Sequence, residues 1–267
     1  MQRNTTDVSG QDSGMLNTTI GSGGDPATPA IHLTLQGKGG VGKSLVASIL
    51  AQYFRHRGAE IHCLDTDPVN QTFSQYTELG AEHLALMDDG KIDSRGFDVL
   101  MERLLTEDGI FIVDNGASTF IPLWSYIVEN NVLELLRSAG RRLCVHTVVT
   151  GGQALGDTLK GFKSLADSSA ERNIVVWLNE YFGVIERDGK TFTKMLAYKE
   201  CEAKIFGLVR IQKRNQDTFG RDIEDVIARK LTFEEAICNG SASVMSKQRL
   251  KLVQRELFEQ LDQMPLV

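Results

Sequence analysis

The stretch Gly37-Lys38-Gly39-Gly40-Val41-Gly42-Lys43-Ser44 decides the fold of this 267-residue chain. It satisfies GxxxxGK[ST], the phosphate-binding P-loop pattern. The glycines let backbone N–H groups turn inward around phosphate oxygens, and the N-terminus of the following helix adds a favourable dipole. Lys43 would then reach the β- and γ-phosphates, and Ser44 would give its hydroxyl to Mg²⁺. The motif therefore predicts a loop that binds MgATP.

The same letters contain a second pattern, because Gly37, Gly39 and Gly42 also spell GxGxxG, the dinucleotide-binding fingerprint. A dinucleotide loop has no need of a lysine and a serine directly after its last glycine. A ribose-binding acid at the end of the next strand would also leave a second aspartate, two positions on, without a role. We therefore favour the P-loop over a dinucleotide site, and both over a plain glycine turn.

On both sides of this loop the sequence alternates between strand and helix patterns. Ile31, Leu33 and Leu35 alternate along a short strand, apolar residues recur at helical spacing from 45 to 53, and Gly58 ends that helix. Further short apolar runs predict strands at residues 61–64, 110–113, 143–149, 174–178 and 205–211. Strands that alternate with helices imply right-handed crossovers. We therefore predict an α/β fold: a single doubly wound, mainly parallel sheet with helices on both faces.

Composition bounds the remaining possibilities. Residues 1–30 are rich in Gly, Ser, Thr and Asn, and we predict that they form a flexible leader. We predict that residues 31–267 form a P-loop nucleotide-binding domain with a helical C-terminal part. The net charge of −6 argues against a surface built throughout for nucleic acid. Four scattered cysteines suggest reduced thiols and no zinc site, and no apolar stretch is long enough for a membrane helix. We expect a cytoplasmic bacterial protein.

Carboxylates follow two of the predicted strands where each strand ends. Asp65 and Asp67 come directly after residues 61–64, and Asp114 directly after residues 110–113. The carboxyl ends of parallel strands share one edge, where ligands bind in open α/β folds. Asp114 occupies a Walker B position, from which a carboxylate can hold the Mg²⁺ shell. Aspartate is also common in turns, but three carboxylates beside a P-loop favour a metal and phosphate site.

Two polar residues lie in or at the end of other predicted strands. Asn179 ends the strand at 174–178, where its amide could read the base of a nucleotide through a paired donor and acceptor, or serve only as a turn residue. His146 lies inside an apolar strand and is interpreted as a core histidine with satisfied hydrogen bonds rather than as a catalyst.

The last predicted helix carries a basic set and an apolar set of residues. The basic set consists of Lys247, Arg249, Lys251 and Arg255. Acidic residues follow it closely, so we interpret it as a solvated face rather than a DNA-binding patch. The apolar set, which shares one face of the helix, consists of Leu250, Val253, Leu257, Leu261 and Met264. We expect this face to pack on the body of the protein rather than to contact a membrane.

With Lys38 as a second lysine, KGGVGKS (38–44) resembles the deviant Walker A motif of the ParA/MinD family of ATPases. In that family two subunits usually sandwich two ATP molecules, so the resemblance implies a nucleotide-dependent homodimer. Carried over by position, Lys38 would act on the partner's nucleotide, Asp67 would place the attacking water, and Asp65 and Asp114 would support Mg²⁺. The implied nucleotide-binding set is Gly37, Lys38, Gly39, Gly40, Val41, Gly42, Lys43, Ser44, Leu45 and Asn179.

A narrower resemblance covers nearly everything after residue 30. The chain is similar to a group of conjugal transfer proteins of broad-host-range plasmids in the blocks LQGKGGVGKS (35–44), DTDPVN (65–70), DNGAS (114–118), HTVVTGGQAL (146–155), VVWLN (175–179) and LFEQLD (257–262). This resemblance implies an accessory factor in plasmid DNA transfer, alongside components of a type IV secretion apparatus.

The chain departs from partition ATPases at three places. Leu45 stands where they carry a second threonine, and this puts one contact with the α-phosphate in question. Val69 replaces a common glutamine, and Asn115-Gly116 replaces Thr-Pro after the Walker B aspartate. We therefore expect hydrolysis to be slow or dependent on a partner. Two alternatives stay open: a partition-type ATPase that binds DNA in its ATP state, and a small-molecule P-loop ligase or synthetase, for which no second substrate pocket is recognisable.

Overall fold

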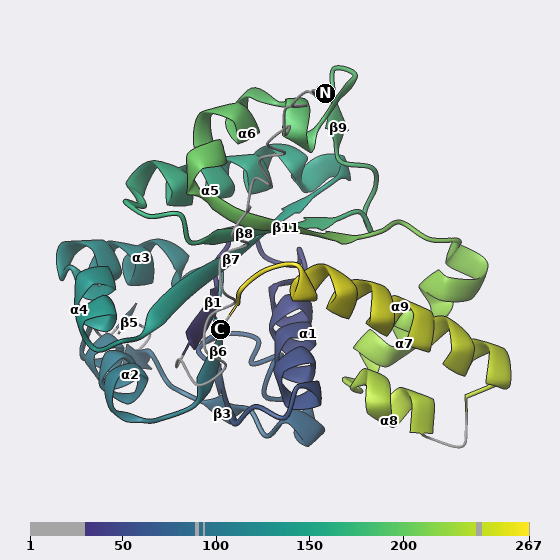
Figure 1. The fold of residues 1–267 in the computed structure, drawn as a ribbon, viewed down its shortest axis with the longest axis horizontal. Helices are drawn as coiled ribbons and strands as arrows, with labels where there is room; N and C mark the ends of the chain where they lie inside the picture. Colours follow the sequence, from purple (N-terminus) through teal and green to yellow (C-terminus); the bar gives the residue numbers. More distant parts are fainter. Residues whose placement is uncertain (1–29, 89–90, 93, 239–241, 267) are drawn as a thin grey trace, which may run out of the picture.

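The computed structural model describes residues 30–88, 91–92, 94–238 and 242–266 (Figure 1). The leader predicted at residues 1–30 lies outside these residues except for Ala30, which begins the first strand. The large sheet has seven strands in the order β11-β8-β7-β1-β6-β2-β3, and all neighbouring strands are parallel. Its strands are β1 (Ala30–Thr34), β2 (Ile61–Asp65), β3 (Glu82–His83), β6 (Ile110–Asp114), β7 (Arg142–Thr150), β8 (Ile174–Asn179) and β11 (Ile205–Ile211). The predicted parallel α/β sheet is confirmed.

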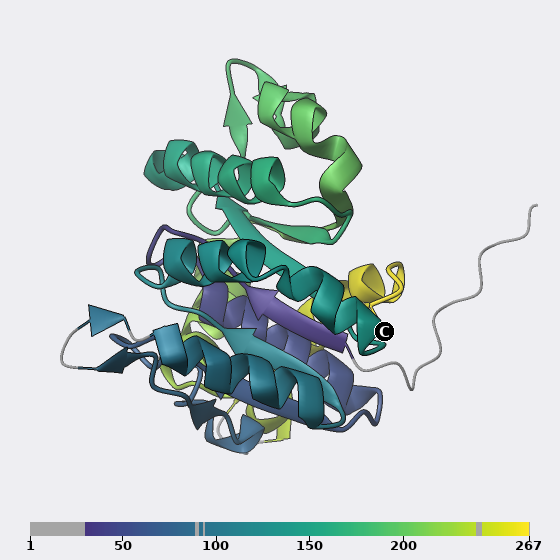
Figure 2. The ribbon, with the colours of Figure 1, turned by 90° about the vertical axis from the view of Figure 1, so that its left-hand side faces the viewer.

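Helices cover both faces of this sheet, as predicted. The helices over the first face, at the left and top of Figure 1 and in front of the strands in Figure 2, are α2 (Ser94–Thr106), α3 (Phe120–Glu129), α4 (Val132–Ser138), α5 (Leu155–Ser168) and α6 (Leu196–Cys201). Those over the second face are α1 (Lys43–His56), α7 (Arg221–Ala228), α8 (Phe233–Cys238) and α9 (Val244–Asp262).

Alternation along the strands builds a separate hydrophobic core on each face. Ile31 and Leu33 of β1 belong to the first core, whereas Val175 and Trp177 of β8 belong to the second. Successive side chains of a strand point to opposite faces, so a parallel sheet that is covered on both sides needs apolar residues at nearly every position. The carboxyl ends of all seven strands are thereby held at one edge of a rigid sheet.

Sequence analysis missed the shortest strands. β3 adds only two residues to the edge of the sheet, and the hairpins β4 (Met87–Asp88) with β5 (Lys91–Ile92) and β9 (Glu186–Arg187) with β10 (Lys190–Thr191) lie outside it. The second hairpin had a usable signal, because Asp188-Gly189 is a favoured two-residue turn. Both residues have positive φ, 52° and 69°.

Helix α9 packs on the body of the protein, as expected. Its apolar residues Leu250, Val253, Leu257 and Leu261 are buried in the second core. Gln260 of the same helix binds the outer strand β11, since it accepts a hydrogen bond from Arg210 N at 2.7 Å and donates one to Arg210 O at 3.1 Å. In the described part of the chain we find no helix with the length and apolar character needed to cross a membrane.

His146 is a core histidine, as predicted. Trp177 Nε1 donates to His146 Nδ1 at 3.0 Å, which leaves the proton on His146 Nε2 to be donated to His32 Nδ1 at 2.9 Å. Burial lowers the pKa of His146 to about 3, and burial also lowers that of His32. Both imidazoles are therefore neutral structural groups of the second core.

Candidate nucleotide-binding site

The sheet brings the predicted site residues to one edge. The P-loop follows β1, Asp65 and Asp114 are the last residues of β2 and β6, and Asn179 is the last residue of β8. Asp65 and Asp114 are also partners in the pairing of β2 with β6, so their side chains leave the same edge next to each other. The segment from Gly37 to Gly40 is exposed there. The structure therefore groups the residues that the spacing alone had only suggested.

Two glycines of the P-loop adopt backbone conformations that other residues rarely take. Gly40 and Gly42 have φ values of 73° and 106°. A side chain on Gly42 would also place its Cβ 2.9 Å from Nδ2 of Asn179. Helix α1 then begins at Lys43, with its N-terminus at the loop. The loop thus has the tight turn and the helix N-terminus that favour anion binding.

Lys43 lies in the interior of the loop. Its residue is only 8% exposed, and Nζ donates to the backbone oxygen of Lys38 at 3.4 Å. Burial lowers the pKa of Lys43, while the carboxylates of Asp114 and Asp67 oppose that change. A buried ammonium with one long hydrogen bond to a carbonyl is poorly compensated. Phosphate oxygens in the loop would supply the missing negative charge, so the residues fit a nucleotide.

Asp114 is the most strongly perturbed carboxylate of the edge. It is 1% exposed, and burial raises its pKa to about 6. The negative charge of neighbouring Asp65 raises the pKa further, whereas the hydrogen bonds from the Ser44 and Thr34 hydroxyls lower it. Thr34 Oγ1 donates to Oδ1 at 2.7 Å. A divalent cation beside Ser44 would favour the ionised form. The placement of Ser44 and Asp114 therefore fits a magnesium ion bound with the phosphates.

Asp65 holds the loop that carries Asp67. Its Oδ1 accepts from the backbone N–H of Asp67 at 3.0 Å, and its Oδ2 accepts from that of Ser74 at 2.9 Å. Asp67 accepts in turn from Val69 N at 2.9 Å. Gly116 lies against Asp67, since a Cβ there would be 2.8 Å from Asp67 Oδ1. The structure thus gives Asp65 a positioning contact that sequence analysis missed, and its role toward Mg²⁺ stays a prediction.

Lys38 is exposed, in contrast to Lys43. Its amine forms an ion pair with Asp157 Oδ2 at 3.0 Å, and the two side chains are 46% and 53% exposed. Asp157 lies in the first turn of α5, and sequence analysis did not identify it. An exposed pair of this kind is weak, so Lys38 can leave Asp157 at little cost.

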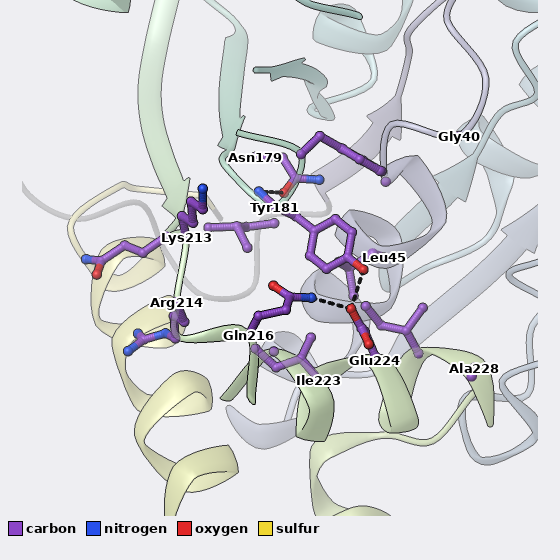
Figure 3. A pocket seen from close by; sticks show the side chains of 16 residues that line it. Gly40, Leu45, Asn179, Tyr181, Lys213, Arg214, Gln216, Ile223, Glu224 and Ala228 are labelled. Carbon is purple, nitrogen blue, oxygen red and sulfur yellow. Dashed lines mark hydrogen bonds between the residues drawn. The ribbon is translucent and has the colours of Figure 1, made fainter. Parts of the chain in front are cut away.

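A cavity of about 400 Å³ opens beside the loop, at Gly40, Gly42 and Leu45 (Figure 3). We call it the side pocket, and its volume is within the range of roughly 300–1,000 Å³ usual for small-molecule sites. Its remaining lining comes from the end of β8 and the segment after it, the end of β11 and the segment after it, and helix α7: Asn179, Tyr181, Phe182, Ile211, Gln212, Lys213, Arg214, Gln216, Gly220, Ile223, Glu224, Ile227 and Ala228. Sequence analysis placed Gly40, Gly42, Leu45 and Asn179 in the nucleotide-binding set, but none of the lining residues after 210.

Asn179 joins the P-loop to the side pocket. Its Nδ2 donates to the backbone oxygen of Val41 at 2.9 Å, and its Oδ1 accepts from Tyr181 N at 3.1 Å. Both ends of the amide therefore bind backbone groups of this chain. Its predicted part in binding the nucleotide stays a prediction, and the contact with Val41 adds a structural role.

Comparisons with known proteins agree with this geometry. Residues 33–244 match the model of the CobQ/CobB/MinD/ParA nucleotide binding domain. The chain belongs to this family. Two members from Escherichia coli, both called protein TraL, are 48% and 46% identical to it over 233 residues, which is 87% of this chain and 97% of each relative.

Two solved structures share the fold. The MinD cell division protein of Aquifex aeolicus aligns with a TM-score of 0.50 at 14% identity, over 86% of this chain and 97% of that one. A putative plasmid partition protein from Borrelia burgdorferi B31, solved with AMPPNP bound, gives a TM-score of 0.50 at 14% identity, over 84% and 98%.

Proposed function

We propose that this chain is an ATP-driven switch that forms a dimer with MgATP, hydrolyses ATP slowly or on stimulation by a partner, and serves conjugative transfer of plasmid DNA in the bacterial cytoplasm. The observation that carries the ATP-binding part is the convergence of Lys43, Ser44 and Asp114 at the carboxyl edge of the sheet. The similarity to TraL proteins, together with the resemblance of this sequence to conjugal transfer proteins, supports the cellular role.

Each site residue has a part in this proposal. Lys43 and the loop N–H groups would bind the phosphates, and Ser44 with Asp114 would hold Mg²⁺, which when bound neutralises charge on the phosphates. Asp67, held in place by its loop, would orient the attacking water. Lys38 would exchange Asp157 for the nucleotide of a second subunit.

Exposed apolar residues beside the site support a dimer. Val69 follows the Asp67 turn, Ile121 lies in the first turn of α3 after β6, and Phe182 with Val184 follows β8, so all four lie near the carboxyl edge. Their exposed fractions are 73%, 67%, 51% and 57%. Apolar side chains gathered around a site favour contact with another protein surface. A second copy, which would bring Lys38 to the opposite nucleotide, fits this edge.

The test is the oligomeric mass of the wild type and of Asp67→Ala with ATP, ADP or no nucleotide. A variant blocked in hydrolysis should accumulate an ATP-bound dimer, Lys38→Ala should bind ATP but stay monomeric, and Lys251→Ala on the exposed face of α9 should behave as wild type. A nucleotide-bound Asp67→Ala protein that stays monomeric would remove the dimer from the proposal, and absence of nucleotide binding would remove the switch.

The two alternative functions gain no specific support. Arg249 pairs with Asp222 at 2.5 Å and Arg255 with Glu259 at 3.7 Å, so half of the basic set that could bind DNA is engaged within the chain. A ligase needs a second substrate pocket beside the phosphates. The side pocket instead continues from the loop at Leu45, on the side where the nucleoside of a bound nucleotide would extend, so it does not supply that second pocket.

A further inference from the structure

A cavity of about 300 Å³ lies at the opposite edge of the sheet from the P-loop, where α4 leads into β7. We call it the arginine pocket, and its lining includes Arg137, Arg141, Arg142, Glu171, Leu133 and Leu143. Strand β7 has nine residues, so at about 3.3 Å per residue the pocket is roughly 30 Å from the carboxyl edge. The arginine pocket is therefore separate from the candidate nucleotide-binding site.

Arg141 is the most deeply buried charge of the arginine pocket. Its side chain is 5% exposed, and within the described residues its Nη1 has no hydrogen-bond acceptor. The carboxylate that pairs with its Nη2, that of Asp108, is 3.9 Å away and 99% exposed, so this pair is long and screened by water. A buried guanidinium with so weak a partner is poorly compensated, and an anion in the pocket would supply the missing charge.

The neighbouring carboxylates are engaged with other arginines. Glu107 accepts from Arg103 through both of its oxygens, at 2.7 and 3.1 Å. Those hydrogen bonds are the main reason why the pKa of Glu107 is lowered, and the charge of Arg141 contributes least. Glu171, the acid that lines the arginine pocket, pairs with Arg137. Neither carboxylate therefore compensates Arg141.

The arginine pocket carries a surplus of positive charge, since three arginines and one glutamate line it. Arg142 has neutral partners: its Nη2 donates to the carbonyl of Pro265, and its guanidinium lies 5.6 Å from the centre of the Phe206 ring. Arg141 and Arg142 are thus both short of negative charge. A doubly charged anion between them would balance the pocket.

Phosphate fits these demands better than a carboxylate does. It carries close to two negative charges at neutral pH, and its oxygens match the parallel N–H groups of a guanidinium. Leu133 and Leu143 would contact a small apolar group attached to the phosphate. The turn that presents Arg141 is fixed, because the backbone N–H of Arg141 donates to Leu136 O at 2.8 Å.

We propose that the arginine pocket binds a phosphate group, either as the free ion or as a small phosphate monoester, with Arg141 as its main ligand. This site goes beyond the proposed function, because it lies at the other edge of the sheet and does not use the P-loop. Occupation of the pocket pairs the buried guanidinium, so the bound anion stabilises the folded protein.

The experiment measures by titration calorimetry the dissociation constants of inorganic phosphate and phenyl phosphate for the full chain. MgADP is present to occupy the P-loop, and sodium chloride holds the ionic strength constant. NMR of protein labelled with ¹⁵N at arginine then locates the site, because the Nε–H resonance that is absent from Arg141→Gln should shift as phosphate saturates the wild type. Tighter binding of phenyl phosphate would identify a monoester as the ligand, and otherwise the ligand is the free ion.

Three variants give three different expectations. Arg141→Gln should bind phosphate roughly ten-fold or more weakly, the range of a charged hydrogen bond. Glu171→Gln removes the negative charge of the lining and should bind phosphate about three-fold tighter, the size of one solvated charge interaction. Arg187→Gln is the matched control, because it changes an exposed arginine of β9, outside the large sheet, and should behave as wild type. Glu171→Gln keeps the test decisive if Arg141→Gln does not fold.

Two results would overturn this proposal. One is the absence of saturable binding of both phosphates by wild type, and the other is binding by Arg141→Gln and Glu171→Gln that equals that of wild type. Either result would leave nucleotide binding and dimer formation in place. Failure of the protein to bind MgADP would count against the proposed function instead, and the dependence of phosphate binding on Arg141 would still decide this proposal.

Discussion

The phosphate end and the base end of the site are built in opposite ways. At the phosphate end Lys43 and Asp114 are charged groups buried at 8% and 1% exposure, and burial displaces the pKa of both. At the base end the walls are mainly apolar, and Glu224 is partly buried with two hydrogen-bond donors of its own. At one end the buried charges are incompletely compensated by the protein, and at the other the carboxylate accepts two hydrogen bonds, both at Oε1.

This difference suggests how the two ends divide the work of recognition. Buried charges without full compensation destabilise the nucleotide-free protein, and the phosphates and Mg²⁺ would relieve them, so this end would supply most of the affinity. The mainly apolar pocket, where the Glu224 carboxylate already accepts two hydrogen bonds, would supply less of the affinity. The tests below separate these contributions.

The largest effect should come from Lys43→Ala. Loss of a charged hydrogen-bond donor to phosphate should weaken ATP and tripolyphosphate alike, by roughly 100-fold, which is about 3 kcal/mol. Titration calorimetry with both ligands measures this, and Lys251→Ala on the exposed face of α9 serves as the matched lysine control with unchanged affinity. Loss of ATP binding with tripolyphosphate binding intact would place the contribution of Lys43 outside the phosphate end.

A smaller effect is expected from Asp114→Asn on the nucleotide-free protein. Because the folded pKa of Asp114 is raised to about 6 from 3.8, the folded state holds its proton more tightly than the unfolded state. Ionisation then opposes folding: stability falls as pH rises from about 4 to 6, and the penalty is complete above that. Removing the charge should raise the free energy of unfolding at pH 7.5 by about 3 kcal/mol.

Thermal unfolding of Asp114→Asn across pH 4–8 measures this change. The advantage over wild type should shrink as the pH falls from 6 towards 4 and disappear below the unfolded pKa of 3.8, where the wild-type carboxyl becomes protonated in both states. Mg²⁺-dependent ATP binding should be weaker at all pH values. Glu129→Gln changes an exposed carboxylate near the end of α3 and should leave the curve unchanged. A variant less stable than wild type at every pH would show that the charge of Asp114 does not destabilise the fold.

The smallest effect is expected at Leu45, where the two ends meet. Leu45→Thr would add a hydroxyl near the position of the α-phosphate. A neutral hydrogen bond contributes about 1 kcal/mol to binding, and the loss of the leucine's apolar contact offsets part of that gain. We expect ADP and ATP to bind about three-fold tighter. Leu45→Val, which removes a methylene without adding a hydroxyl, should bind slightly more weakly, and equal behaviour of the two variants would argue against an α-phosphate contact at this position.

The two ends also differ in how far the sequence predicts them. The phosphate end follows from local rules: the glycines at 40 and 42 need positive φ, Lys43 and Ser44 follow them directly, and Asp114 ends a run of buried strand residues. Each rule acts within a few residues. The predicted strands were therefore confirmed, and the predicted phosphate-site residues lie together at one edge.

The base end depends on contacts between distant segments. Tyr181 and Glu224 meet across 43 positions of sequence, and the amide of Asn179 meets Val41 across 138. No periodicity or motif marks such pairs, because they depend on how the segments after β8 and β11 fold back over α1. The same reason explains why Asp157, the partner of Lys38, was missed: it has the appearance of an ordinary acidic residue in a first helical turn.

The contact of Gln260 with Arg210 has a consequence for assembly. Strand β11 ends the sheet, and an exposed edge strand is a template on which strands of other molecules can add. By accepting from Arg210 N and donating to Arg210 O, the Gln260 amide takes the place of an incoming strand at that position. Uncontrolled growth at this edge is thereby hindered, so a rise in mass with nucleotide would report a closed pair rather than the start of a fibre.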